Sequence, residues 1–241
     1  MVSIKKNDYN VKITFYKERS SKDYITSDDN DRDLLAESLA RSKRLVLDYA
    51  YNNTWDYFIT LTFDVDKLDR FNITLCKDKL LKAFSNYKNH YDKDLKYILI
   101  PEFHKDKKAI HFHGLLKTKK NHFFTTLFYN YDYHCVVLRH EYFFKRFGAN
   151  QLVPIHHQQE QVGNYICKYM TKGALRIFDV SYFASKGLNV STNLLNSDSK
   201  DLKQFLLCEV LDGKRPSFYN TFVTQYTLPI ADFEKYYKED K

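Results

Sequence analysis

Long apolar runs and paired cysteines are both missing from this chain of 241 residues. No segment approaches the roughly 18 consecutive apolar residues that a membrane-spanning helix needs. Residues 1–9 carry Lys5 and Lys6 with no apolar run behind them, which is not the pattern of a secretion signal. The four cysteines lie singly, without a Cys-x-x-Cys pair, which argues against a zinc ribbon and against a disulfide framework. We therefore expect a protein of the reducing cytoplasm, with no membrane partner.

Glycine and proline are also scarce, at 6 and 4 residues, and the sequence has no internal repeat, low-complexity tract or clear interdomain linker. Hydrophobic residues make up 44% of the chain and charged residues 28%. These values are ordinary for soluble globular chains, and they argue against wholesale disorder and against a fibre. The length suits one domain, or one domain with an appendage, because single domains hold about 100–200 residues.

Positive charge is in excess and is concentrated in the middle of the chain. Lys and Arg minus Asp and Glu is 38 − 30 = +8 overall, and the central residues 77–120 alone contribute 12 − 5 = +7. A basic segment interleaved with Phe and Tyr can release counterions from a phosphate backbone while its rings stack on bases. This pattern favours a nucleic acid as partner, although lysine-rich segments also occur as solvated faces with no ligand.

Periodicity predicts an α+β fold, an antiparallel central sheet with helices packed on it. The expected strands cover residues 9–15, 57–64, 95–104, 109–117 and 151–157, and the expected helices cover residues 32–51, 74–91 and 160–172. The order β-α-β-α-β-β, with helices returning over one face, resembles the ferredoxin-like or split βαβ arrangement. Pro154 favours an edge position for its strand, and Gly173 is expected to end the last helix. The patterns weaken beyond residue 174.

Two histidines provide the clearest candidate for a metal site. His111 and His113 are two residues apart on an expected strand, so both side chains project from one face. If the hairpin pairs residues whose numbers sum to 213, Glu102 lies directly across from His111 on that face. Two imidazoles and a carboxylate suit Mn²⁺ or Mg²⁺ and could accept Zn²⁺ or Co²⁺. The alternative is that these are ordinary surface polar groups; His104, His156 and His157 are weaker ligand candidates.

A second group of reactive side chains recurs at helical spacing. Tyr165, Lys168, Tyr169 and Lys172 follow the i, i+3, i+4, i+7 pattern, so two phenols and two ammonium groups share one helix face. A neighbouring stripe of Val162, Ile166 and Met170 can pack into the core. Lysine charges and a metal-polarised phosphate would make a phenol a competent nucleophile. The alternative is that the tyrosines only border the core and the lysines only face solvent.

With these residues in place, the sequence resembles the HUH endonucleases, and within them the rolling-circle replication initiator (Rep) proteins of small phages and plasmids. Residues 58–63 (Phe-Ile-Thr-Leu-Thr-Phe) are similar to the first family motif, residues 110–116 (Ile-His-Phe-His-Gly-Leu-Leu) to the histidine motif, and residues 165–172 to the Tyr-x-x-Lys motif, here doubled. Residues 100–105 are similar to the family segment whose acidic residue completes the metal site. The resemblance extends over about half the chain, residues 57–173, and implies a ferredoxin-like or RRM-like fold.

The resemblance implies a nicking and rejoining activity on a single-stranded or hairpin origin. Tyr165 would be the nucleophile that forms a 5′-phosphotyrosine link, with Tyr169 taking a second cleavage. The pattern fits either tyrosine, so their order stays open. Lys168 and Lys172 would neutralise phosphate charge or assist phenol deprotonation, and a Mn²⁺ or Mg²⁺ ion on His111, His113 and Glu102 would polarise the phosphate. Further DNA contacts are expected from Lys105, Lys107, Lys108, Thr60 and Thr62.

The same resemblance sets expectations for domains and partners. Residues 1–173 would form the nicking domain, and residues 174–241 a C-terminal extension of unknown role or a part of the same domain. No Gly-x-x-x-x-Gly-Lys-Ser/Thr loop is present, so a host helicase is expected alongside a DNA polymerase in the cytoplasm of a bacterial cell. The rival functions are a transposase or relaxase of the same superfamily, and a non-catalytic single-stranded DNA-binding protein. Relaxases commonly place the tyrosine N-terminal to the histidines, unlike this chain.

Overall fold

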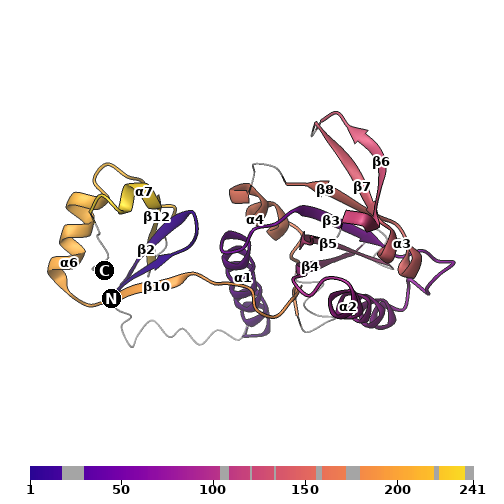
Figure 1. The fold of residues 1–241 in the computed structure, drawn as a ribbon. Helices are drawn as coiled ribbons and strands as arrows, with labels where there is room; N and C mark the ends of the chain where they lie inside the picture. The colour runs from indigo at the N-terminus through magenta and orange to yellow at the C-terminus, as the bar shows by residue number, and fades with distance from the viewer. Residues whose placement is uncertain are drawn as a thin grey trace. The chain divides into compact units, whose positions relative to one another are not determined.

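The computed structural model describes residues 1–17, 30–103, 109–119, 121–132, 134–155, 159–171, 180–219 and 223–236. The chain divides into two compact units (Figure 1). Unit 1 combines Met1–Asn30 with Asn189–Lys241, and unit 2 is Asp31–Leu188. The α+β fold with antiparallel sheets is confirmed. None of the helices among these residues combines the length and the apolar character needed to cross a membrane.

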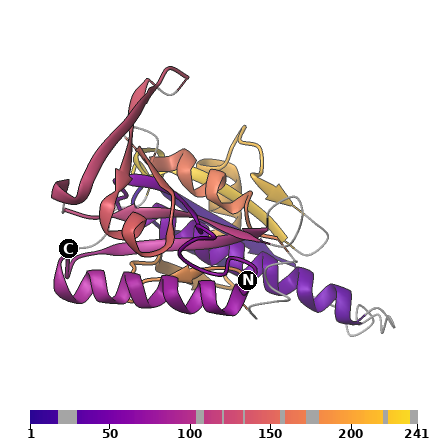
Figure 2. The same cartoon turned by 90° about the vertical axis from the view of Figure 1, so that its right-hand side faces the viewer.

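Unit 2 is built on an antiparallel sheet. Within the described residues its strand order is β6-β7-β8-β3-β5-β4-β9. These strands are β3 (Tyr57–Thr62), β4 (Lys96–Phe103), β5 (Ile110–Lys117), β6 (Phe124–Asn130), β7 (Cys135–His140), β8 (Asn150–Pro154) and β9 (Phe183–Ala184). The β6–β7 hairpin extends beyond the helix-covered part of the sheet (Figure 2). The central strands β3, β5 and β4 therefore form the floor on which the candidate site is built.

Helices cover both faces of this sheet, and not one face as expected. On one face, α2 (Ile73–His90) and α3 (Glu141–Phe147) pack on the apolar residues of β3, β4 and β5 that include Leu61, Leu99 and Phe112. On the other face, α1 (Asn30–Tyr51) and α4 (Gln159–Cys167) pack on Ile98 and Leu115. Both arrangements follow from strand alternation, because successive side chains point to opposite faces. The central strands carry apolar residues on both faces and thus need cover on both.

The strand containing Pro154 is not at an edge, contrary to the expectation from proline. β8 pairs with β3, where Tyr57 lies opposite Pro154, and with β7, where Leu138 lies opposite Leu152. Pro154 is the last residue of β8, so its missing N–H interrupts no hydrogen bond in the middle of the sheet. The expected helix over residues 160–172 is also shorter than predicted. It ends at Cys167, and i→i+3 hydrogen bonds continue the turn to Met170; Gly173 lies outside the described residues.

Unit 1 joins the two ends of the chain in one antiparallel sheet. Its strand order in the described residues is β10-β1-β2-β12-β11, formed by β1 (Val2–Lys6), β2 (Asn10–Tyr16), β10 (Thr192–Ser197), β11 (Phe218–Tyr219) and β12 (Val223–Pro229). One face packs against α6 (Lys200–Phe205), a π-helical turn at Leu206–Val210 and α7 (Ile230–Phe233). The compact units therefore divide the chain at other points than the expected limits, residues 1–173 and 174–241. Whether residues 174–241 act in DNA recognition stays a prediction.

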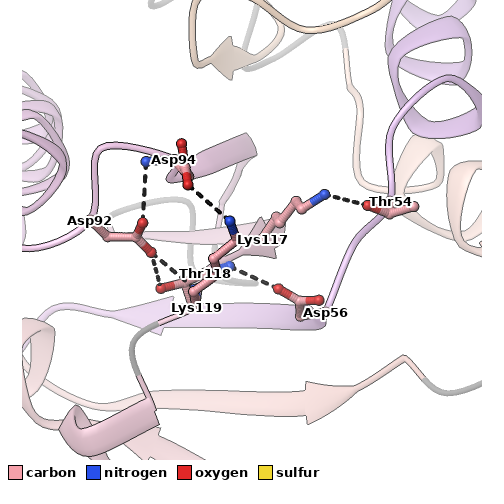
Figure 3. Close-up of polar contacts among 7 residues, drawn as sticks. All are labelled: Thr54, Asp56, Asp92, Asp94, Lys117, Thr118 and Lys119. Atoms are coloured by element: carbon pink, nitrogen blue, oxygen red, sulfur yellow. Dashed lines mark hydrogen bonds and ion pairs between the residues drawn. The ribbon is translucent and has the colours of Figure 1, made fainter.

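A polar network fixes the end of β5 that lies away from the histidines (Figure 3). The carboxylate of Asp92, which is 3% exposed, accepts a hydrogen bond of 2.6 Å from the Thr118 hydroxyl. It also accepts bonds from the backbone N–H groups of Lys119 and Asp94, at 3.1 and 3.2 Å. The Thr118 N–H donates to Asp56 just before β3. The network ties β5 to the loops that precede β3 and β4, so the register of all three strands is held at this end.

Candidate active site

The register of the β4–β5 hairpin brings a carboxylate and two imidazoles together. Glu102 lies opposite His111, as the sum of 213 predicts, and the prediction is confirmed. His111 and His113 project from the face that carries α1 and α4, because Leu115 of the same parity packs there. The Glu102 carboxylate lies 2.8 Å from Nε2 of His113. The side chain of Glu102 is diagonal to His113 on this face, within the reach of a long side chain.

Each histidine is held from the other side by a threonine of β3. Thr60 lies opposite His113 and Thr62 opposite His111. Their hydroxyls are 3.2 and 2.9 Å from the Nδ1 atoms of the two rings. The sequence predicted DNA contacts for these threonines, which stay a prediction. The observed contacts give them another role, in which the hydroxyls set the orientation of the imidazoles.

Burial keeps His113 neutral. The side chain is 12% exposed, and loss of solvent lowers the pKa of His113 to about 4. A neutral imidazole is the form that binds a metal ion through a ring nitrogen. Glu102 is more open, with 38% of its side chain exposed. A ligand that approaches this face from solvent would therefore meet the carboxylate.

Helix α4 places the tyrosines over this face because its apolar stripe is buried. Val162, Ile166 and Met170 are at most 7% exposed and pack in the core with α1, which confirms the predicted stripe. Gly163 permits the close approach of the two helices, since a Cβ there would lie 3.0 Å from the Cβ of Ala50. Burying this side of the helix turns positions 165 and 169 toward the strands below.

The two phenols and one imidazole are in direct contact. The ring of Tyr169 stacks on His113 with 3.9 Å between centroids and 19° between planes. The Tyr169 hydroxyl donates a hydrogen bond of 2.9 Å to the Tyr165 hydroxyl. Phe58 of β3 touches both tyrosines and stacks with His113 at 6.1 Å. The structure thus gathers residues more than 40 positions apart in sequence on one face of one sheet.

Lys168 is the described basic residue closest to the phenols along α4. Its Nζ lies 5.5 Å from the centroid of the Tyr165 ring, within cation–π range. The other predicted basic residues, Lys105, Lys107, Lys108 and Lys172, lie outside the described residues, as do His104, His156 and His157. Their expected contacts stay predictions.

The donor set suits a divalent cation in its chemistry but is not arranged for one as it stands. Two imidazoles and a carboxylate share a face, and both Nδ1 atoms already contact threonines. Within the described ranges, however, no three His, Cys, Asp or Glu side chains converge closely enough to hold a metal ion. The carboxylate of Glu102 is engaged with His113. It would have to exchange that hydrogen bond for a metal bond.

Phe58 and Gly114 contribute to the site in ways that the sequence reasoning missed. Phe58 forms an aromatic floor beneath the tyrosines, and the alternation that puts it on the same face as Thr60 was the available signal. Gly114 follows His113 on β5. A Cβ there would clash with the backbone carbonyl of Ile98 and lie 2.7 Å from Cδ2 of Leu99. Glycine therefore allows the close pairing of β4 and β5 that brings Glu102 to the histidines.

Comparison with known proteins gives one match. Residues 56–174 match the family model of the replication-associated protein ORF2/gene-2 protein, a segment slightly shorter than half the chain. The matched segment runs from β3 to the end of α4 and contains every residue of the site described above. No curated protein and no solved structure matches the chain significantly. The family match is consistent with a role in the initiation of replication.

Proposed function

We propose that unit 2 is an endonuclease that nicks and rejoins single-stranded DNA at an origin to initiate rolling-circle replication, as the HUH resemblance implies. The observation that carries the proposal is the contact between Tyr169 and His113, with the Tyr165 hydroxyl 2.9 Å from that of Tyr169. A phosphate bound over His111, His113 and Glu102 would lie close to a phenolic oxygen. This proximity is the requirement for transfer of a phosphoryl group to tyrosine.

Tyr165 is the proposed nucleophile. It is 39% exposed, so its hydroxyl can meet a DNA strand and release its proton to solvent. Attack by the phenolic oxygen forms an O–P bond and breaks the bond to the 3′ oxygen, which takes up a proton and becomes a free 3′-OH. The strand is left on Tyr165 as a 5′-phosphotyrosine. The reverse attack by a 3′-OH would rejoin a strand without an external energy source.

The neighbours of Tyr165 stabilise charge during this step. The Tyr169 hydroxyl already donates a hydrogen bond to the Tyr165 oxygen, and such a bond strengthens as that oxygen becomes anionic. The ammonium of Lys168 lies over the Tyr165 ring and favours the phenolate. A Mn²⁺ or Mg²⁺ ion held by His111, His113 and Glu102 would supply Lewis-acid polarisation of the scissile phosphate. Tyr169 would serve a second cleavage only after leaving its stack on His113.

The partners follow from the products of the proposed step. A free 3′-OH is the substrate of a DNA polymerase. A displaced strand has to be unwound, and because this sequence contains no P-loop, we propose that a separate host helicase supplies that activity.

The test is covalent capture of labelled origin DNA. Wild-type protein, Tyr165→Phe, Tyr169→Phe and the double variant are incubated with the single strand and Mn²⁺, and a detergent-stable adduct is measured on a denaturing gel. We expect the adduct to fall to background in Tyr165→Phe and to persist in Tyr169→Phe. An undiminished adduct in Tyr165→Phe would assign the nucleophile to Tyr169. His113→Ala serves as a control for a site that retains both phenols.

The second candidate function is a non-catalytic single-stranded DNA-binding protein. The observation in its favour is that Glu102 is hydrogen-bonded to His113 and that no complete metal-binding group is preformed in the described residues. This candidate predicts DNA binding that a chelator does not change and no adduct in wild-type protein under any metal. The same gel therefore separates the two functions.

A further inference from the structure

A cleft of about 480 Å³ lies between α1 and residues 180–188, entirely within unit 2. Its described lining is mostly hydroxyl groups, from Ser38, Ser42, Ser181 and Ser185, together with Tyr182 and Lys186. Ser38 and Ser42 are one helical turn apart and so face the cleft together. The volume is within the range of sites that hold a small ligand, about 300–1,000 Å³.

The hydroxyl of Ser181 indicates that the cleft is built for a polar ligand. Ser181 is 1% exposed, and its Oγ has no hydrogen-bond partner among the described residues. A buried hydroxyl without a partner costs about 1–3 kcal/mol, so most such groups in native proteins are paired with protein or ligand. Ser185, by contrast, accepts a hydrogen bond of 3.1 Å from the Tyr97 N–H and so helps to hold its segment on β4.

The charge of the cleft selects an anion. Lys186 is exposed and forms no ion pair with any described residue. No aspartate or glutamate is present in the described lining. A lysine with several hydroxyl donors and no competing carboxylate matches the requirements of a phosphate group.

An aromatic pair gives the cleft a surface for a planar group. The rings of Tyr49 and Tyr182 line it, with 6.4 Å between centroids and 66° between planes. Burial raises the pKa of Tyr182, so this phenol keeps its proton and acts as a hydrogen-bond donor at neutral pH. Stacking of a base on a tyrosine is worth about 1–3 kcal/mol.

The cleft lies on the same face of the sheet as the candidate active site. β9 pairs with β4, with Ala184 opposite Ile98, whose side chain points to the α1 and α4 face. Tyr182 and Tyr169 both pack against the hydrophobic cluster of that face. A strand that crosses the active site could therefore continue over this face toward the cleft.

We propose that this cleft binds one nucleotide, with its phosphate on Lys186 and the serine hydroxyls and its base against Tyr182. The inference rests on the proposed function in one respect, the source of the nucleotide, which we assign to the DNA strand being nicked. A free nucleotide has the same chemistry, and the experiment distinguishes the two sources.

The test measures binding and not cleavage. Affinity for a fluorescein-labelled single-stranded oligonucleotide of mixed sequence is measured by anisotropy over a series of salt concentrations, for wild-type protein, Ser181→Ala and Lys186→Ala. We expect each variant to bind about tenfold more weakly, the effect of one hydrogen bond to a charged group. Lys186→Ala should also reduce the salt slope by about 0.7, the value for one phosphate contact in a single strand. Lys82→Ala, an exposed lysine of α2 on the opposite face, is the matched control and should not change binding.

Two further measurements keep the result interpretable. Thermal unfolding of Ser181→Ala should be unchanged or raised, because the lost hydroxyl has no partner in the free protein, so weaker binding would not reflect misfolding. A fluorescent deoxynucleoside triphosphate tests the free source, and binding of it that equals or exceeds that of the oligonucleotide would move the assignment to a free nucleotide. The inference is overturned if wild-type protein binds neither probe, or if both variants bind like Lys82→Ala. Failure of the nicking proposal appears elsewhere, as wild-type protein that binds the oligonucleotide but forms no adduct.

Discussion

Replacing His140 by phenylalanine should remove an acid sensitivity that is built into the core of unit 2. His140 is fully buried at the end of β7, against the rings of Tyr87, Phe123 and Phe143. Neither ring nitrogen has a hydrogen-bond partner among the described residues. Burial lowers the pKa of His140 to about 3 from its ordinary 6.5; the nearby carboxylate of Glu141 acts in the opposite direction but is outweighed.

The sign and size of the effect follow from proton linkage. The unfolded chain protonates His140 with the ordinary pKa of 6.5, whereas the folded chain keeps it neutral until about pH 3. The unfolded state therefore binds more protons between these values, and the contribution of His140 to stability is lost as pH falls from about 6.5. Between about pH 7 and about pH 5 the loss is about 2 kcal/mol, at about 1.4 kcal/mol per proton and pH unit. This window lies well above the folded pKa, so the result does not depend on its exact value.

The assay is urea unfolding followed by the fluorescence of Trp55, the single tryptophan, which is buried in unit 2. The free energy of unfolding of wild-type protein and of His140→Phe is measured at about pH 7 and about pH 5. The variant should lose about 2 kcal/mol less over this interval, whatever its stability at neutral pH. Hydrogen bonds between the His140 backbone and the Asn150 side chain do not involve the ring and should persist in the variant. Equal losses in the two proteins would refute the reasoning.

Three further substitutions test the supports of the site. Asp92→Ala leaves one hydroxyl and two backbone N–H groups without their acceptor, and should lower the free energy of unfolding by about 3 kcal/mol in the tryptophan assay; a change under about 1 kcal/mol would contradict the role of the network. Gly114→Ala should force β4 away from β5, destabilise unit 2 by about 2 kcal/mol or more and reduce adduct formation, so a variant of wild-type stability would contradict the steric argument. Thr62→Val removes the hydroxyl that contacts His111 and should raise the Mn²⁺ concentration needed for half-maximal adduct by about 10- to 100-fold, whereas Thr62→Ser should behave like wild type.

Local patterns predicted the parts of the site that lie close in sequence. Alternation placed His111 and His113 on one face, and a short connection between two strands left few possible registers, one of which sets Glu102 opposite His111. The stripe of Val162, Ile166 and Met170 predicted the buried side of α4. In each case the information needed is contained within about 20 residues, because strand and helix periods are local properties.

Contacts between distant segments could not be predicted in the same way. The sheet of unit 1 pairs β2 with β12, which places Phe15 opposite Thr224, and no local pattern in either strand identifies the other. The stack of Tyr169 on His113 depends on how α4 packs over the sheet, and the motifs only indicated that both residues belong to one site. The contacts of Thr60 and Thr62 with the imidazoles require the pairing of β3 with β5, which joins strands about 50 residues apart.

The threonines also explain how one arrangement can serve the site with and without a cation. In the present geometry Nε2 of His113 must carry the proton that is shared with the Glu102 carboxylate, so Nδ1 is an acceptor and the Thr60 hydroxyl donates to it. If Nε2 coordinated a cation, the proton would have to reside on Nδ1, and Thr60 would become the acceptor. A hydroxyl can take either role by rotation, whereas a carbonyl or carboxylate accepts only and would favour one tautomer. A threonine beside each histidine therefore permits Glu102 to leave His113 for a cation without leaving any ring nitrogen unpaired.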